Sequence, residues 1–104
     1  MTDINKTLHT LNCTVREYPA TLQRLLLCAS ADDSLLLIEN GVYNLTDATA
    51  LAAISRSQLK LYCLNADLLA RGLSNMPMDS ATVVDENGFV ELACSHQKVI
   101  SWFV

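Results

Sequence analysis

The sequence predicts an α/β domain in which a mostly parallel five-stranded sheet lies between two layers of helices. Short apolar segments alternate with helical segments along the chain, a pattern that produces right-handed crossovers between parallel strands. The segment Ser34–Ile38 is apolar almost throughout, as expected of a strand covered on both faces. The 104 residues suffice for one such unit, so we expect residues 1–104 to form a single domain.

The expected strands cover residues 7–11, 34–38, 59–64, 80–84 and 98–104. The expected helices cover residues 19–31, 48–57, 66–71 and 85–96, and a polar loop covers 74–79. Pro19 suits the first turn of a helix, because its missing N–H leaves no hydrogen bond unmade there. Thr46 or Asp47 is expected to cap the second helix and Asn65 the third, which Gly72 should end.

The composition favours a subunit that is partly covered by a partner. Apolar residues make up 51% of the chain and charged residues 17%, whereas about 25% charged residues is typical of soluble domains. A net charge of -4 opposes a phosphate backbone, so we expect no direct binding of nucleic acid. No apolar run approaches the ~20 residues that cross a bilayer, and the polar first ten residues lack the features of a secretory signal. The expected location is therefore the cytoplasm.

Several kinds of site lack their sequence signals. The glycines Gly41, Gly72 and Gly88 are too far apart to form a phosphate-binding loop, and no GxSxG motif for a serine nucleophile occurs. His9 is expected to be a hydrogen-bonded strand residue, and His96 a favourable cation at a helix C-terminus. We therefore expect neither a metal nor another cofactor.

Thiols are the remaining candidates for chemistry, because an exposed cysteine with a lowered pKa can accept sulfur as a persulfide. The four cysteines form no CxxC motif. Cys63 lies in a strand expected to be covered on both faces and is predicted to be inert, and Cys28 and Cys94 are predicted to pack in the core. Cys13 follows the first strand, three residues before Arg16, and is the candidate for a reactive thiol. Ligands of such sheets gather at the carboxyl ends of the strands.

Five segments in order resemble the TusB family, which is called DsrH in sulfur-oxidising bacteria. They are "LHTLN", "LLLIENGVY", "LKLYCLNADLLARGL", "VVDENGFVEL" and "KVISWF". The resemblance covers nearly the whole chain and implies a DsrE-like fold of flavodoxin-like architecture. It further implies a subunit of the TusBCD sulfurtransferase complex, a dimer of heterotrimers with TusC-like and TusD-like partners. That complex relays persulfide sulfur, received through TusA, to TusE for 2-thiouridine formation at the tRNA wobble position.

The resemblance also implies that the transferring cysteine belongs to the TusD subunit. DsrH proteins can carry a cysteine early in the first helix, and an ungapped alignment places that position near Leu25, so the thiol is absent here. The chain is therefore expected to be a non-catalytic subunit. Two alternatives stay open: a sulfur carrier acting through Cys13, and a binding module with a pocket near Asn12, Asn40 and Asn65.

Two aromatic residues near the end of the chain are candidates for contact with a partner. Trp102 and Phe103 follow one another in the last apolar segment. Aromatic side chains concentrate binding energy at protein interfaces. Packing in the core is the alternative interpretation of both residues.

Overall fold

The computed structural model describes residues 3–77 and 79–104; residue 78, in the predicted loop, lies outside this part. Its five strands form one parallel sheet in the order β4-β3-β2-β1-β5. The strands are β1 (Asp3–Leu11), β2 (Ser34–Leu37), β3 (Lys60–Leu64), β4 (Thr82–Val84) and β5 (His96–Trp102). The predicted fold class is therefore confirmed, and every strand pairing in the described part is parallel.

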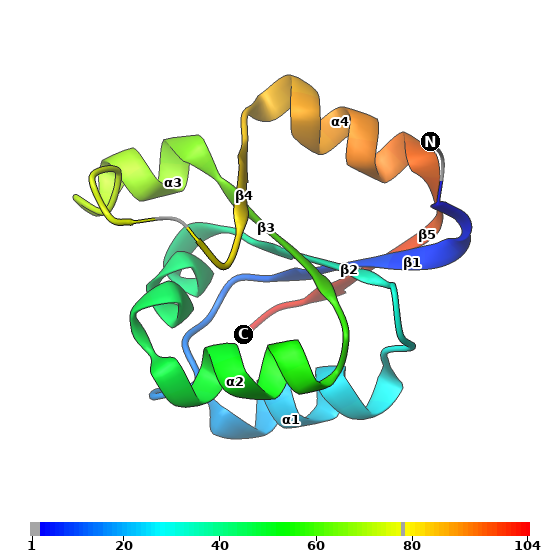
Figure 1. Cartoon of the computed structure of the whole chain (residues 1–104), viewed down its shortest axis with the longest axis horizontal. Helices are drawn as coiled ribbons and strands as arrows, with labels where there is room; N and C mark the ends of the chain where they lie inside the picture. The colour runs from blue at the N-terminus through cyan, green and yellow to red at the C-terminus, as the bar shows by residue number, and fades with distance from the viewer. Residues whose placement is uncertain (1–2, 78) are drawn as a thin grey trace.

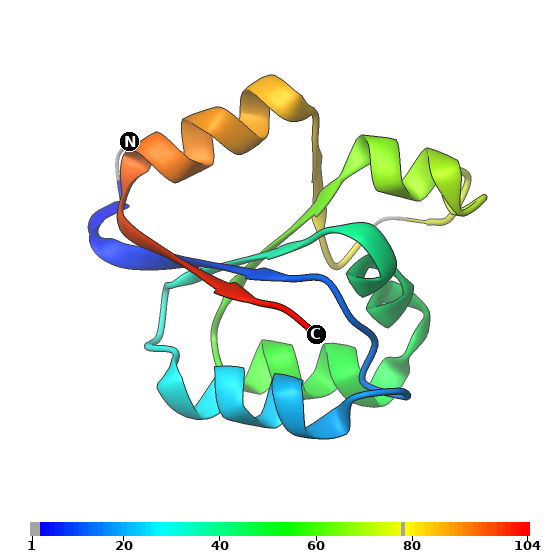
Figure 2. The same ribbon diagram turned by 180° about the vertical axis from the view of Figure 1, so that it is seen from behind.

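Helices cover both faces of the sheet and complete three layers. They are α1 (Pro19–Cys28), α2 (Ala48–Arg56), α3 (Asn65–Ala70) and α4 (Glu86–Ser95), with a 3-10 helix η1 (Glu39–Thr46) after β2. Figure 1 shows α1 and α2 together on one face and α4 on the other, and the reverse view in Figure 2 agrees. No helix among the described residues is long and apolar enough to span a membrane.

The strand order explains why α4 stands alone on its face. From β1 to β4 each strand is added next to the preceding one, whereas β5 returns to the free side of β1. This last crossover runs in the opposite direction along the sheet, and a right-handed connection then places its helix on the opposite face. As a result β2 is the central strand, β1 lies between β2 and β5, and β4 and β5 are the edge strands.

The main core lies between the sheet and the α1–α2 layer. Its fully buried members include Leu11, Leu25, Leu35 and Leu37. The other face is packed less completely. Leu8 and Leu36 are buried there, but α4 has no buried residue of its own.

One of the two expected helix caps is present and the other is not, and a further cap begins α4. Asp47 accepts a hydrogen bond from the N–H of Ala50 at 3.0 Å, and Asp85 begins α4 in the same manner. The prediction that Asn65 caps α3 is wrong, because Asn65 is the first helical residue and the preceding position is Leu64. Gly72 follows that helix with φ of 69°, in agreement with the expected stop.

Two element ends, the start of β1 and the end of α1, differ from the prediction by more than two residues. β1 begins at Asp3 rather than Thr7, since its first residues pair with the start of β5 through a register shift. α1 ends at Cys28 rather than at residue 31, because the Asp33 carboxylate accepts a hydrogen bond from the N–H of Ser30 at 2.9 Å and turns the chain toward β2.

The 3-10 helix η1 was not expected from the sequence. It packs over the end of β1 at Gly41, where an added Cβ would lie 2.1 Å from the carbonyl oxygen of Leu11. The N–H of Ile38 donates to that same oxygen at 3.0 Å. Glycine is therefore required at position 41 for close approach of two backbone segments.

Candidate functional site

The carboxyl ends of the parallel strands meet at one border of the sheet, which we call the carboxyl edge. It consists of segments 12–18, 38–46, 65–71, 85–88 and 103–104. The sequence places its candidate loops at this edge. The structure brings Cys13, Asn12, Asn40 and Phe103 to it, together with side chains that the sequence did not single out.

Cys13 is held inside the loop after β1 rather than presented to solvent. The side chain of Asn44, in η1, donates to the carbonyl of Cys13 at 3.0 Å and accepts from the N–H of Val15 at 2.9 Å. The side chain of Cys13 is 5% exposed. Burial raises the pKa of the Cys13 thiol; a hydrogen bond with Thr21 acts in the opposite direction, and the charge of Glu17 adds to the increase. The loop therefore disfavours the thiolate.

The other three thiols are placed differently from one another. Cys63 is fully buried, as predicted, and burial raises the pKa of its thiol to about 11. The prediction that Cys28 and Cys94 pack in the core is wrong, because both are exposed. Cys28 is the last residue of α1, and Cys94 lies in the last turn of α4. Neither exposed thiol therefore lies at a helix N-terminus, where a thiolate is stabilised.

The first helix places Leu25 in the centre of the core. The resemblance places the DsrH cysteine near this residue. Its side chain has no exposed surface, and it packs with Leu11, Leu22 and Leu35. Near that position this chain therefore has a buried apolar side chain.

A polar network joins η1 to α3 at the carboxyl edge. The Asp67 carboxylate accepts from the backbone N–H of Glu39 at 2.7 Å, and Arg71 donates to the Asn40 side chain at 3.0 Å. Arg71 also forms an ion pair with Asp67 at 3.4 Å. Glu39 has φ of 50°, which a residue with a side chain adopts only when its surroundings impose it. The segments "IENG" and "NADLLARG" are thus joined in space, and Asp67 was not predicted.

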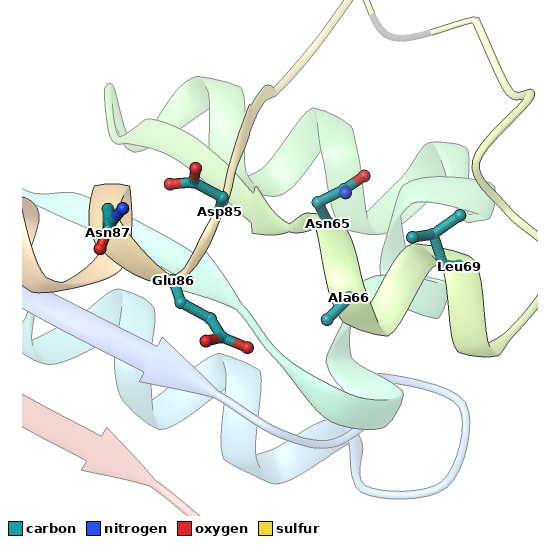
Figure 3. Close-up of a pocket in the computed structure, with 6 residues that line it drawn as sticks. All are labelled: Asn65, Ala66, Leu69, Asp85, Glu86 and Asn87. Carbon is teal, nitrogen blue, oxygen red and sulfur yellow. The ribbon is translucent and has the colours of Figure 1, made fainter.

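The three asparagines proposed for a binding pocket do not line one cavity. Asn12 and Asn40 line a cavity of about 250 Å³ together with Glu17 and Glu39. Asn65 lines a different cavity of about 300 Å³, formed by residues 65–69 of α3 and residues 85–87 at the start of α4 (Figure 3). Carboxylates line both cavities, and Asp85 is already engaged as a helix cap. The structure therefore contradicts the alternative of one pocket near all three asparagines.

The two aromatic candidates near the end of the chain have different surroundings. Trp102 is half-buried against the main core, and its indole N–H donates to Nδ1 of His9 at 3.1 Å. Phe103 is 63% exposed. The backbone N–H of Val104 donates to the side chain of Asn12 at 3.2 Å. The last residue of β5 is therefore hydrogen-bonded to β1 and Val104 to the loop after β1, while Phe103 is exposed to solvent.

Both histidines are buried and hydrogen-bonded. Nε2 of His9 lies 3.2 Å from the Asp33 carboxylate, which confirms the prediction for His9. His96 follows the end of α4 as expected, and it is the buried first residue of β5. Its ring nitrogens are 2.6 Å from the carbonyl oxygen of Leu92 and 2.9 Å from Oγ of Ser34.

Asp33 accepts several hydrogen bonds at the start of β2. Burial opposes its ionisation, but the backbone N–H groups of Ser30 and Thr7 and the ring of His9 outweigh that effect and lower the pKa of Asp33. Asp33 is 4% exposed. It is therefore a buried carboxylate whose negative charge is compensated by three donors, two from β1 and one from the turn after α1.

The all-parallel sheet with one helix alone on its second face defines a small three-layer domain of the DsrE-like class. The solved structure of the YchN protein from E. coli has this fold, with a TM-score of 0.73 over 94% of this chain and 99% of YchN. The sequence identity is 13%. The structural similarity therefore concerns the fold alone.

Sequence comparison identifies the family. Residues 17–99 match the family of DsrH like proteins. The chain is 33% identical to Protein TusB of Pectobacterium carotovorum subsp. carotovorum (strain PC1), over 91% of this chain and 99% of that protein. It is also 33% identical to Protein TusB of Yersinia pestis (strain Pestoides F), over 82% of this chain and 90% of that protein. The chain belongs to the TusB/DsrH family, which confirms the resemblance.

Proposed function

We propose that this chain is a non-catalytic subunit of a cytoplasmic TusBCD-type sulfurtransferase complex. In that role it assembles with TusC-like and TusD-like chains, and the complex passes persulfide sulfur from TusA to TusE for 2-thiouridine formation at the tRNA wobble position. Family membership and the placement of the four thiols support this proposal together. The thiol that carries sulfur then belongs to a partner.

The state of the thiols is the observation that carries the proposal. A cysteine that accepts sulfur needs solvent access and a stabilised thiolate. Cys13 and Cys63 are buried and their pKa values are raised, whereas Cys28 and Cys94 are exposed near helix C-termini. None of the four combines exposure with a helix N-terminus. The same facts argue against a sulfur carrier acting through Cys13.

The surface around β5 supports a partner on that side. β5 is an edge strand, and Val99 within it and Phe103 and Val104 after it are 43%, 63% and 59% exposed. An edge strand with exposed apolar residues is prone to association unless something covers it. We call these three residues the C-terminal apolar residues. We propose that they contribute to the contact with a homologous subunit, with Phe103 as the anchor.

Co-purification tests the assembly. The chain is expressed with TusC-like and TusD-like chains from the same source, with a tag on the TusD-like chain, and the complex is sized in solution. We expect all three chains in one particle. A chain that elutes alone at every concentration, while the other two associate, would contradict the proposal.

A matched pair of variants tests the contact. Phe103→Asp places a charge at the proposed anchor and should reduce the recovery of this chain at least about tenfold, since truncation of an interface anchor costs about 2 kcal/mol. Leu27→Asp is the control, because Leu27 is 86% exposed on α1, on a different part of the surface. Equal recovery of both variants at the wild-type level would exclude Phe103 as an anchor.

Mass spectrometry separates the proposal from the carrier alternative. The assembled complex is incubated with a persulfide donor and its chains are analysed without reduction. Each added sulfur increases the mass by about 32 Da. We expect the increase on the TusD-like chain and not on the peptide that contains Cys13. An increase on that peptide which is lost in Cys13→Ser would establish the alternative.

A further inference from the structure

A chain of hydrogen bonds runs through the interior from the start of β2 to the end of β5. The Asp33 carboxylate lies 3.2 Å from Nε2 of His9, and Nδ1 of the same ring lies 3.1 Å from the indole nitrogen of Trp102. The centroids of the two rings lie 6.3 Å apart, and their planes are inclined by 30°. His9 is 1% exposed, so water does not replace these contacts.

The chemistry of the two neighbours fixes the protonation of the His9 ring. The indole N–H of tryptophan is only a donor, so Nδ1 of His9 must accept and must carry no proton. An ionised carboxylate is only an acceptor, so Nε2 must carry the proton and donate to Asp33. His9 is therefore the neutral Nε2–H tautomer when both contacts are formed.

We propose that the Asp33–His9–Trp102 chain is a pH-sensitive latch that positions the C-terminal apolar residues. A proton added to Nδ1 of His9 points at the N–H of Trp102, so two donors face each other and the indole must move away. The imidazolium remains beside Asp33, with which it forms an ion pair. Acidification therefore releases Trp102 and keeps His9 in place.

Asp33 is the charged group in contact with His9. The elements around the ring also carry charged or titratable side chains that reach solvent. These are Lys6 of β1, Arg24 and Cys28 of α1, Asp32 before β2, and Lys98 of β5. β2 contributes Leu35 and Leu37 to this side of the sheet. The ring therefore responds to protonation through its two hydrogen-bonded neighbours.

Release of Trp102 changes the position of Phe103 and Val104, because these residues follow it directly. In the latched state their placement is fixed from two sides, by the indole contact with His9 and by the bond from the N–H of Val104 to Asn12. A side chain that is fixed before binding loses less entropy on binding. If the chain acts as the proposed subunit, assembly is then weaker in acid than at neutral pH; this consequence rests on the proposed function, and the latch does not.

Nuclear magnetic resonance of the full-length chain tests the latch without any partner. Trp102 is the only tryptophan, so one indole N–H signal reports on it. At about pH 8, where histidine is ordinarily neutral, the ¹⁵N shifts of His9 should show the Nε2–H tautomer. As the pH is lowered, the indole signal should shift with the same midpoint as His9, as expected for loss of its hydrogen bond to the ring. The Nδ1–H tautomer, or an indole signal that ignores the titration of His9, would overturn the proposal.

Two variants distinguish a latch from simple packing. Trp102→Phe keeps an aromatic ring and removes the N–H, so the Phe103 and Val104 signals should no longer follow the titration of His9. His9→Gln is a neutral replacement that can both donate and accept; its indole signal should be independent of pH. Signals of Phe103 that still follow His9 in Trp102→Phe would contradict the proposal. His96 is recorded in the same spectra and contacts Ser34 and Leu92 instead of Trp102.

The partner experiment separates the two proposals. The recovery of the wild-type chain with its TusC-like and TusD-like partners should be lower below the midpoint measured for His9 in the spectra than above it, and His9→Gln should remove the difference. Failure to assemble at either pH would refute the proposed function and leave the spectroscopic result on the latch valid. Assembly that is independent of pH in the wild type would overturn the effect of the latch on binding.

Discussion

Cys63 has no exposed surface, and its thiol, with a pKa raised to about 11 by burial, is almost entirely protonated at neutral pH. Because the thiolate is the nucleophile, alkylation of the folded chain should modify Cys28 and Cys94 first and leave Cys63 unmodified until the chain unfolds. Peptide mass spectrometry at several reaction times measures this order. Denatured protein is the control, in which all four thiols should react. Labelling of Cys63 at the rate of Cys94 in folded protein would contradict the assigned burial.

The pKa of Asp33 is lowered, so its contribution to stability has a definite dependence on pH. The contribution is fully present above the ordinary carboxyl pKa of about 3.9 and is lost as the pH falls through the lowered pKa of the folded state. In Asp33→Asn the side-chain N–H₂ group, itself a donor, faces groups that donate to Asp33 in the wild type. The substitution should therefore reduce the free energy of unfolding at pH 7 by about 2 kcal/mol. Urea unfolding at several pH values measures the difference from wild type, which should shrink in acid. Asp32→Asn, exposed at the adjacent position, is the control.

The sequence predicts the burial of Cys63 but not the exposure of Cys28. A strand of apolar residues in a parallel sheet is covered on both faces, so the prediction for Cys63 follows from composition alone. In α1, by contrast, apolar residues occur on most sides of the helix, and its contacts with the sheet decide which face is inward. Leu22 and Leu25 are buried there, whereas Leu27 is 86% exposed. Which face of α1 points inward therefore depends on tertiary packing, and so does the exposure of Cys28.

At the scale of elements, substitutions of two glycines test how closely η1 approaches the sheet and how α3 ends. In Gly41→Ala the new Cβ meets the Leu11 carbonyl oxygen at 2.1 Å, so backbone must move and the cost should be about 3 kcal/mol or more. In Gly72→Ala the Cβ meets open space, and only the positive φ of 69° is unfavourable, at about 1 kcal/mol. Thermal and urea unfolding of both variants measure the contrast. Equal destabilisation would refute the close approach at Gly41.

The helix caps give a second prediction at this scale. Asp47→Ala and Asp85→Ala each remove a hydrogen bond to an N-terminal N–H and should destabilise the chain by about 1 kcal/mol. Asn65→Ala is the matched control, because Asn65 makes no cap bond, and it should change stability by less than about 0.5 kcal/mol. Chemical unfolding measures all three. A larger loss for Asn65→Ala than for Asp47→Ala would reverse the assignment of the caps.

The order of elements is predictable from the sequence, because each strand is a short apolar run and each helix has a start or stop signal. The 3-10 helix η1 is not predictable in the same way. Its start depends on the Asp67 carboxylate, which is distant in sequence and accepts from the N–H of Glu39. The loop around Cys13 likewise depends on Asn44. These parts of the carboxyl edge are set by single polar contacts between segments, for which the local pattern has no signal.

The whole molecule is packed unequally on the two faces of its sheet. α1 and α2 enclose the main core, while α4 has no buried residue and leaves Val90 60% exposed on its surface. The Thr10 hydroxyl, on the α4 side of β1, is the buried side-chain oxygen without a hydrogen-bond partner among the described residues. The excess of apolar residues in the composition thus corresponds to the α4 face of the sheet, where apolar side chains are only partly buried.

The unequal packing of the two faces predicts which segment of the isolated chain unfolds locally first. Segments with few buried contacts open at lower free energy than the core. Amide hydrogens of α4 should therefore exchange at least about tenfold faster than those of β2, which is buried along its whole length. A difference of about 1.4 kcal/mol in opening free energy is enough to produce a tenfold difference in exchange rate. Hydrogen exchange read by mass spectrometry measures both segments. α2 serves as the reference helix, since Ala50 and Ile54 anchor it in the core.

The same measurement on the proposed complex tests which part of the surface a partner covers. A partner that binds over β5 and its flanking helix should slow exchange in α4 and in the segment after Trp102, while α2 remains as in the isolated chain. Slowing confined to α1 and α2 would place the contact on the well-packed side and would contradict the role assigned to Phe103. Protection follows burial of backbone at the interface, so this experiment locates the contact independently of any substitution.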